Sequence, residues 1–210
     1  MLKQSFAIAA VLAVSFGPTR AAAQGGGPHL PPTFGVLAGA NLSKLGGKDA
    51  SGLKTRTGFV GGVFGVFHAN EFLGFEPEVL YSQKGAKASS GGVTGTFKLD
   101  YVEVPLLARL DIPVTGSAEP FFVLGPAFGF QVKCEAEGTS GGVTATASCS
   151  SLDIPNKKFD MSGTVGAGVG FKAGKQTLSV SVRYTHGFTD VFSNSDAKNR
   201  TWSFLGGIAF

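Results

Sequence analysis

Polar and apolar residues alternate along the segment LDYVEVPLLARLDIPV, which covers residues 99–114. After Asp100, the charged residues Glu103, Arg109 and Asp111 stand at odd positions only. The even positions between them are apolar: Val102, Val104, Leu106, Ala108 and Leu110. Because successive side chains of a strand point to opposite faces, this pattern predicts a strand with one apolar and one charged face.

Similar segments recur along the chain and are separated by turn signals. Strands are predicted to start near Phe34, Gly58, Phe72, Phe97, Pro120, Phe159, Gln176 and Arg200. Short polar turns, HANE, PVTGS and AGK, follow the second, fourth and sixth segments, whereas longer loops follow the others. Alternating short and long connections predict an all-β, up-and-down antiparallel barrel of eight strands over residues 34–210.

The solvent around this barrel is not decided by periodicity alone. An apolar face on every strand suits a soluble barrel with an apolar cavity, or a membrane barrel with an apolar outside. Charged residues in mid-strand favour the second alternative, since they fit best as paired groups in a narrow lumen. These residues are Glu76, Glu78, Glu103, Arg109 and Arg183. Burying them unpaired costs several kcal/mol each, so we expect a lumen cluster in which Arg183 reaches Glu103 or Glu78.

Prolines and aromatic residues refine the strand assignment. A proline cannot donate to a strand ladder, and a closed barrel has no edge strand, so Pro77, Pro105 and Pro126 each predict a bulge or a gap in pairing. Tyr81, Tyr184 and Trp202 lie near predicted strand ends. Aromatic residues at such places are expected to form girdles at the membrane interfaces.

The N-terminal segment has the layout of a cleavable signal peptide. Lys3 precedes an apolar core over residues 6–16, and Ala21 and Ala23 supply the small residues of a cleavage site. We predict a signal peptide over residues 1–23 and a periplasmic lead-in over residues 24–33. An apolar run of about 11 residues is too short for a membrane helix.

Composition and cysteine content agree with an exported barrel. The chain has 32 Gly and 19 Phe residues but only 15% charged residues, too few for a typical soluble surface. Without Lys3 and Arg20, 16 basic residues face 14 acidic ones, a net charge of +2 that gives no reason to expect nucleic-acid binding. Cys134 and Cys149 favour a disulfide that pins an extracellular hairpin and extends the fifth and sixth strands. A free-thiol or metal role has no supporting histidine nearby.

Catalytic chemistry finds little support in the sequence. The three glutamates could act as acid–base carboxylates, but ion pairing in the lumen explains them better. His29, His68 and His186 are scattered, and nothing fixes Ser193 or Ser195 beside a histidine for a lipid-facing hydrolase. No phosphate loop, metal-ligand spacing or dinucleotide motif occurs. We therefore expect a protein that is not an enzyme and has no cofactor or metal.

Several motifs together resemble the PorT-like outer-membrane β-barrel family. They are LGFEPEVLYSQKGAK, LDYVEVPLLARL, the Gly125–Pro126 pair and VRYTHGFTDV, in that order, and the resemblance covers roughly residues 34–210. It implies an eight-stranded barrel in the outer membrane of a Gram-negative-type bacterium, and a C-terminal Phe210 that the barrel-assembly machinery reads. Some members of that family are associated with secretion.

Three functions remain open from the sequence. An eight-stranded barrel has an interior that side chains just fill, so we expect a plugged lumen and a structural or binding barrel. Its extracellular loops would contact an envelope protein or ligand, and its wall would contact the membrane lipid. Both termini would lie in the periplasm. The alternatives are a narrow channel, which includes a secretion-associated porin-like protein, and a lipid-facing enzyme.

Overall fold

The computed structural model describes residues 30–193 and 195–210, so the predicted signal peptide and most of the lead-in lie outside it. Within these residues, nine strands and two short 3-10 helices follow one another. Their bounds are β1 (Thr33–Gly46), η1 (Lys48–Ala50), β2 (Lys54–His68), β3 (Leu73–Ser90), β4 (Val93–Asp111), β5 (Ala118–Ser140), β6 (Val143–Ser148), η2 (Ser150–Leu152), β7 (Phe159–Ala173), β8 (Gln176–Gly187) and β9 (Lys198–Ala209).

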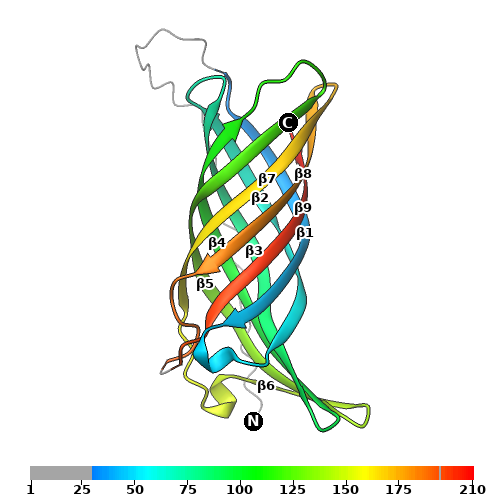
Figure 1. The fold of residues 1–210 in the computed structure, drawn as a ribbon, viewed down its shortest axis with the longest axis vertical. Coiled ribbons are helices and arrows are strands. Elements are labelled where there is room, and N and C mark those ends of the chain that lie inside the picture. Colours follow the sequence, from blue (N-terminus) through cyan, green and yellow to red (C-terminus); the bar gives the residue numbers. More distant parts are fainter. Residues whose placement is uncertain (1–29, 194) are drawn as a thin grey trace, which may run out of the picture.

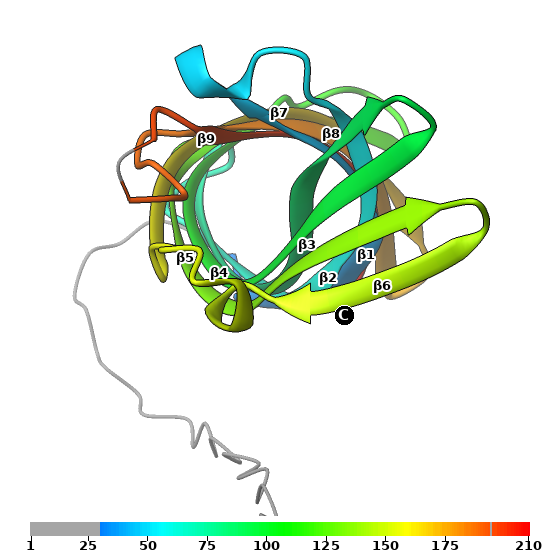
Figure 2. The same ribbon diagram turned by 90° about the horizontal axis from the view of Figure 1, so that it is seen from below.

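Eight of the strands close into an antiparallel barrel, which confirms the predicted fold class. Each barrel strand pairs with the barrel strand that follows it in the chain. Strand β6 is not part of the ring, because β5 pairs directly with β7. The ring closes where β1 pairs with β9, from Gly35 opposite Ala209 to Gly46 opposite Lys198. Figure 1 shows the tilted strands from the side, and Figure 2 shows the closed ring from below. Tilt and closure together remove the free edges that an open sheet would have.

The two ends of the barrel differ in their connections. The turn end carries the short connections 69–72, 112–117 and 174–175, and β1 begins and β9 ends there. The loop end carries the connections 47–53, 91–92, 141–142, 149–158 and 188–197. The C-terminus marks the turn end at the top of Figure 1.

Two loop-end connections differ from the sequence-based expectation. The third barrel strand was expected to lead into a long loop, but β3 and β4 continue past the barrel to a two-residue turn at Gly91 and Gly92. Both glycines have positive φ, 57° and 80°, which suits glycine in a tight hairpin turn. The return strand of the next hairpin is β6, a separate strand, rather than an extension of the sixth barrel strand β7.

These extensions form what we call the projecting sheet: residues 84–90 of β3, 93–99 of β4, 135–140 of β5 and all of β6. The order is β3–β4–β5–β6, and β6 pairs with β5 alone among the strands of residues 30–193 and 195–210. In Figure 2 the two hairpins of this sheet project to one side of the ring.

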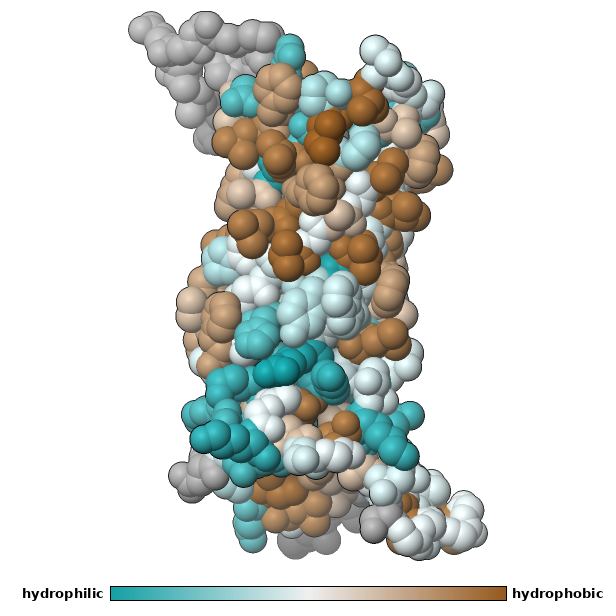
Figure 3. Space-filling model, viewed as in Figure 1, coloured by the Kyte–Doolittle hydropathy of each residue, from teal (hydrophilic) through white to brown (hydrophobic). Residues whose placement is uncertain are grey.

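The barrel is apolar outside and polar inside, the inverse of a soluble domain. The even positions of β4 from 102 to 110 face outward, and large apolar side chains such as Leu124, Val180 and Phe204 are 64%, 58% and 50% exposed. Figure 3 shows the hydrophobic region over the turn-end part of the wall, with hydrophilic residues toward the loop end. An apolar surface of this extent is typical of a protein wall that a hydrocarbon layer covers. Within the described residues, no helix is long and apolar enough to cross a membrane.

The three prolines interrupt the strand ladders without shifting the register. Pro77 pairs with Leu106, and the next pair along that ladder is Leu80 with Glu103. Pro105 pairs with Ala127, and the β4–β5 ladder resumes only at Ala108 and Leu124, so Pro126 lies inside the gap. The expected gaps are therefore present, and the bulges occur elsewhere, between Thr55 and Val60 and between Asp100 and Tyr101.

Candidate functional site

The middle of the lumen holds an ion-paired layer centred on Arg183. The Nη1 of Arg183 donates to both carboxylate oxygens of Glu78, at 2.8 Å each, and its Nη2 donates to Glu76 at 3.0 Å. Arg109 donates to the other oxygen of Glu76 at 2.7 Å. Strand β3 places the two glutamates on its inner face because they are two residues apart, while β4 and β8 supply the arginines. The structure thus brings four of the five expected lumen residues together.

The position of Arg183 depends on a glycine in the neighbouring strand. Gly166 of β7 lies opposite Arg183 of β8. A Cβ added to Gly166 would lie 2.6 Å from the Cγ of Arg183, closer than such atoms approach one another. Gly168 gives the same room to the ring of Phe121, at 2.4 Å. These glycines let large side chains fill a narrow interior.

Glu103 lies apart from this layer, so Glu78 is the one of the two expected partners that Arg183 contacts. Its partner is Lys84, whose Nζ lies 2.5 Å from a carboxylate oxygen of Glu103, and both side chains are buried. Lys84 was missed in the sequence although its signal was present. It stands at an even position of β3, like Glu76 and Glu78, and therefore faces the lumen.

Toward the loop end, a polar network lies beneath an apolar cap. The amide of Asn199 donates to Asp160 at 2.8 Å and to the Tyr101 hydroxyl at 3.2 Å. Side chains from β1, η1, β3, β4 and the 188–197 loop then form the cap: Leu45, Ala50, Ala86, Leu99, Val191 and Ala197, with Leu53 and Phe192 packed against them. Sequence reasoning missed this cap because the inward-turned loop residues belong to no alternating segment.

Little free space remains between these layers. A cavity on the loop-end side of Arg183, which Lys84 and Glu103 help to line, measures about 20 Å³. Another between Arg183 and Arg109 measures about 10 Å³. Each is near the minimum for a single water molecule. Side chains therefore fill the middle of the lumen.

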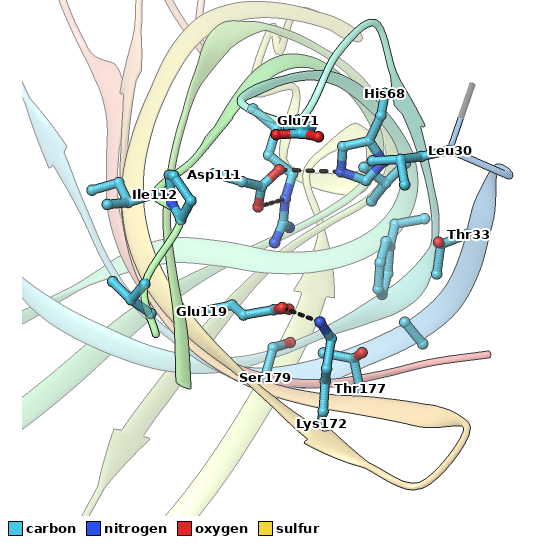
Figure 4. Close-up of a pocket in the computed structure, with 16 residues that line it drawn as sticks. Leu30, Thr33, His68, Glu71, Asp111, Ile112, Glu119, Lys172, Thr177 and Ser179 are labelled. Carbon is cyan, nitrogen blue, oxygen red and sulfur yellow. Dashed lines mark hydrogen bonds and ion pairs between the residues drawn. The ribbon is translucent and has the colours of Figure 1, made fainter. Parts of the chain in front are cut away.

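The turn end, in contrast, opens into a pocket of about 390 Å³ (Figure 4). Asp111 stands at its inner wall, where it accepts a hydrogen bond from the Nε of Arg109 at 2.8 Å and contacts His68 at 3.2 Å. An ion pair between Glu119 and Lys172 spans the opposite side. The guanidinium of Arg109 also stacks on Phe121, at 3.8 Å from the ring centroid. Arg109 thus closes the inner end of the pocket.

The candidate catalytic residues are not brought together. His68 contacts Asp111 in the pocket, whereas His186 contacts the Tyr184 hydroxyl at 3.3 Å on the outside of β8. Among the described residues, no serine–histidine hydrogen bond and no cluster of potential metal ligands occurs. His29 lies outside the described residues, and the expectation that the protein is not an enzyme stays a prediction.

The predicted disulfide is present at the base of the projecting sheet. Cys134 and Cys149 are bonded, with their Cα atoms 5.4 Å apart, and the amide of Cys149 donates to the carbonyl of Cys134. This bond ties the end of β6 to β5.

The 188–197 loop is joined to the start of β9 by a cluster of charges. Hydrogen bonds to Asp190 and Asp196 raise the pKa of Lys198, and the bond from Lys198 lowers the pKa of Asp196.

Aromatic residues expected at the interfaces lie on the outer wall. Trp202 and Tyr184 are cross-strand neighbours whose ring centroids are 5.0 Å apart, and Tyr81 is exposed on β3. Phe210 follows β9, its amide donates to the carbonyl of Phe34, and its side chain is 63% exposed. The structure places this side chain on the outside but does not test its role in assembly.

Comparisons with known proteins agree with this architecture. Residues 23–193 match the family model described as outer membrane protein beta-barrel domain. No curated protein matches the chain. Among solved structures, Neisserial surface protein A (NspA) is similar with a TM-score of 0.51 at 17% identity, over 84% of this chain and 95% of that one.

Two further solved structures are similar at lower TM-scores. The attachment invasion locus protein Ail of Yersinia pestis has a TM-score of 0.42 at 18% identity, over 86% of this chain and 100% of that one. OprG of Pseudomonas aeruginosa has a TM-score of 0.49 at 12% identity, over 86% and 96% of the two chains. The family match covers most of the sequence, so the chain belongs to the outer membrane protein beta-barrel domain family and is a small outer-membrane β-barrel.

Proposed function

We propose that this barrel conducts little or no solute and acts through its loop end, where it binds an envelope protein or a ligand. The observation that carries the proposal is the filled lumen. Arg183 bridges the lumen from β8 to Glu76 and Glu78 on β3, and the apolar cap covers it toward the loop end. A pore would have to break buried ion pairs, which is costly.

The proposal includes an orientation. The short connections and the C-terminus would lie in the periplasm, and the loop end would face outward, as in other outer-membrane barrels. The disulfide at the loop end supports export to an oxidising environment, because such bonds persist there.

The projecting sheet is the surface that we assign to binding. In the part of the chain that the structure describes, β6 pairs with β5 alone, so its other edge offers free backbone groups of the kind that take up an additional strand. Most of β6 is exposed, with Val143 75% exposed at its start. The disulfide fixes this edge in place and lowers the entropy lost on binding.

A second candidate is a narrow channel or a secretion-associated barrel. The pocket of about 390 Å³ at the turn end favours it, since that pocket could receive a small solute or a chain segment from the periplasm. The PorT-like motifs of β3 and β4 also point in this direction. On this view, Arg109 and Asp111 would have to part to admit the solute.

Swelling of proteoliposomes distinguishes the two candidates. Vesicles with the purified barrel should swell in small sugars and amino acids no faster than empty vesicles. Swelling that depends on the folded protein would favour the channel.

The binding role has its own test in living cells. A photo-crosslinking residue placed at Thr146 on β6 should give a discrete protein or glycan adduct, whereas the same residue at Val180 on the lipid-facing wall should not. Failure to form an adduct at Thr146 and at the other exposed positions of β6 would reject the projecting sheet as the binding surface.

A further inference from the structure

Three basic side chains form a row across the outer wall, close to the loop end. Lys44 of β1 lies directly opposite Arg200 of β9, and Arg200 lies opposite His186 of β8. The next outward row toward the turn end is Leu42, Trp202 and Tyr184. In Figure 3 the hydrophilic band toward the loop end borders paler and hydrophobic surface. The row therefore lies where the apolar wall ends.

Neither Lys44 nor Arg200 has a carboxylate partner within ion-pair distance among the described residues. Residues 1–29 and 194 contain no Asp or Glu that could supply one. Two like charges directly opposite each other in a ladder destabilise the strand pair. Lys198 is the next outward-facing residue of β9 toward the loop end, and it does have carboxylate partners. Asp190 and Asp196 lie 2.9 and 2.6 Å from its Nζ.

The backbone holds Arg200 in this unpaired state. A Cβ on Gly46 would lie 2.4 Å from the Nε of Arg200, so the side chain lies flat against β1 and leans toward the loop end. The Nε is shielded from solvent and has no hydrogen-bond acceptor. An anion from outside the protein would offset both the repulsion and the missing acceptor.

We propose that Lys44 and Arg200 bind the phosphate of a lipid headgroup in the leaflet that surrounds the loop end. Arginine and lysine are the usual phosphate ligands, and guanidinium can bind phosphate through two parallel hydrogen bonds. The acyl chains of the same lipid would pack on the adjacent row of Leu42 and Trp202, and the Trp202–Tyr184 pair suits the headgroup boundary. Both contacts come from one molecule, which a free phosphate ion cannot provide. This site is independent of the proposed binding role of the projecting sheet.

Trp202 is the single tryptophan of the chain and reports on its lipid neighbours. The barrel would be reconstituted in phosphatidylcholine vesicles that contain equal fractions of either brominated phosphatidic acid or brominated phosphatidylcholine. Bromine quenches tryptophan on contact, so the ratio of the two quenching curves gives the relative association constant. We expect a preference for phosphatidic acid of roughly fivefold or more, as for a basic residue at a charged membrane surface.

Two variants that remove the same number of positive charges distinguish a specific lipid site from a general effect of the protein's net charge. The variant Lys44→Gln/Arg200→Gln should lose the preference. The control Lys87→Gln/Lys175→Gln removes two exposed basic residues, from the projecting sheet and the turn end, and should keep it. Each variant would first be checked for folding by the heat-dependent shift of its electrophoretic mobility.

Two results would overturn the proposal. One is equal quenching by both lipids in the unmodified protein, a result that needs no variant to fold. The other is an unchanged preference in the folded Lys44→Gln/Arg200→Gln variant. Added inorganic phosphate at millimolar concentration should not abolish the preference, and its loss under that condition would contradict a lipid-specific site.

Discussion

Arg183 donates hydrogen bonds to two carboxylates in the middle of the barrel. Glu76 has a second partner in Arg109, at 2.7 Å, whereas within the described residues Glu78 pairs with Arg183 alone among basic side chains. Glu78 is 2% exposed, so it cannot turn to water if Arg183 is lost. The two glutamates therefore respond differently to the loss of the same arginine.

We predict that Arg183→Met destabilises the barrel by about 3–5 kcal/mol, because it leaves a buried charge without compensation. Guanidinium unfolding in detergent micelles or vesicles would measure the change in the free energy of unfolding. Adding Glu78→Gln should recover much of the loss, since the uncompensated charge is then removed. Adding Glu76→Gln should not, because Glu78 stays unpaired; equal rescue by both would show that the two carboxylates are interchangeable.

At the residue scale, the sequence predicts which side chains face inward but not which of them pair. Parity along β3 and β4 placed the glutamates and Arg109 in the lumen, since a period of two fixes the face. Pairing depends on the tilt and stagger of the strands, which put Glu103 beside Lys84 and Glu78 beside Arg183. That stagger belongs to the closed ring and cannot be found in any one strand.

At the element scale, the tip of the projecting sheet extends beyond the ring, whereas its base packs into the apolar cap through Ala86 and Leu99. Among the described strands, β6 pairs with β5 alone, and the hairpin is joined at its base by Cys134 and Cys149. We predict that Cys134→Ser/Cys149→Ser leaves the barrel folded but loosens this hairpin, with a loss of about 3 kcal/mol in the chain-entropy model for a loop of this length.

Limited proteolysis would measure the effect of the two serines. Cleavage between residues 135 and 148 should become faster, while the barrel fragments stay resistant in detergent. In the unmodified protein, mass spectrometry should find neither thiol alkylated before reduction. Free alkylation of both cysteines in protein from cell envelopes would contradict the disulfide.

The C-terminal strand carries a further prediction. If the exposed ring of Phe210 is read during assembly, Phe210→Asp should lower the folded fraction in the outer membrane and leave export unchanged. Phe210→Trp keeps an aromatic ring and should assemble normally, and Phe188→Asp, an exposed aromatic residue of the loop end, serves as the control. Cell fractionation with electrophoresis of unheated samples measures both quantities, and an unchanged folded fraction for Phe210→Asp would reject the role.

The eight barrel strands and their order could be predicted, because apolar faces recur between clear turn signals. The two-residue turn at Gly91 and Gly92 and the strand β6 could not. Their segments, ASSGGVTGT and TSGGVTATAS, are rich in small polar residues and lack an apolar face, so they look like loops. They form strands by pairing within their own hairpins, and the β4 extension also pairs with the β5 extension beyond the barrel. The β4–β5 pairing joins residues far apart in the sequence, which local pattern does not reveal.

At the scale of the whole molecule, the barrel is blocked by layers of different chemistry. Ion pairs occupy the middle, a hydrogen-bonded network around Tyr101 follows, and an apolar cap lies at the loop end. The plugged lumen could be predicted from the strand number and the size of the inward side chains. The cap could not, because it requires Val191 and Phe192 of a loop to fold inward over the strands.

Single-channel recording in planar lipid bilayers tests the central claim, that this barrel is closed. Purified, folded protein should give no stable open conductance across a range of voltages, while a sixteen-stranded porin inserted under the same conditions gives its usual steps, since such barrels leave an aqueous channel. Arg183→Met should unfold more readily rather than conduct. Reproducible, long-lived, porin-sized openings in the unmodified protein would contradict the account and make the channel its function.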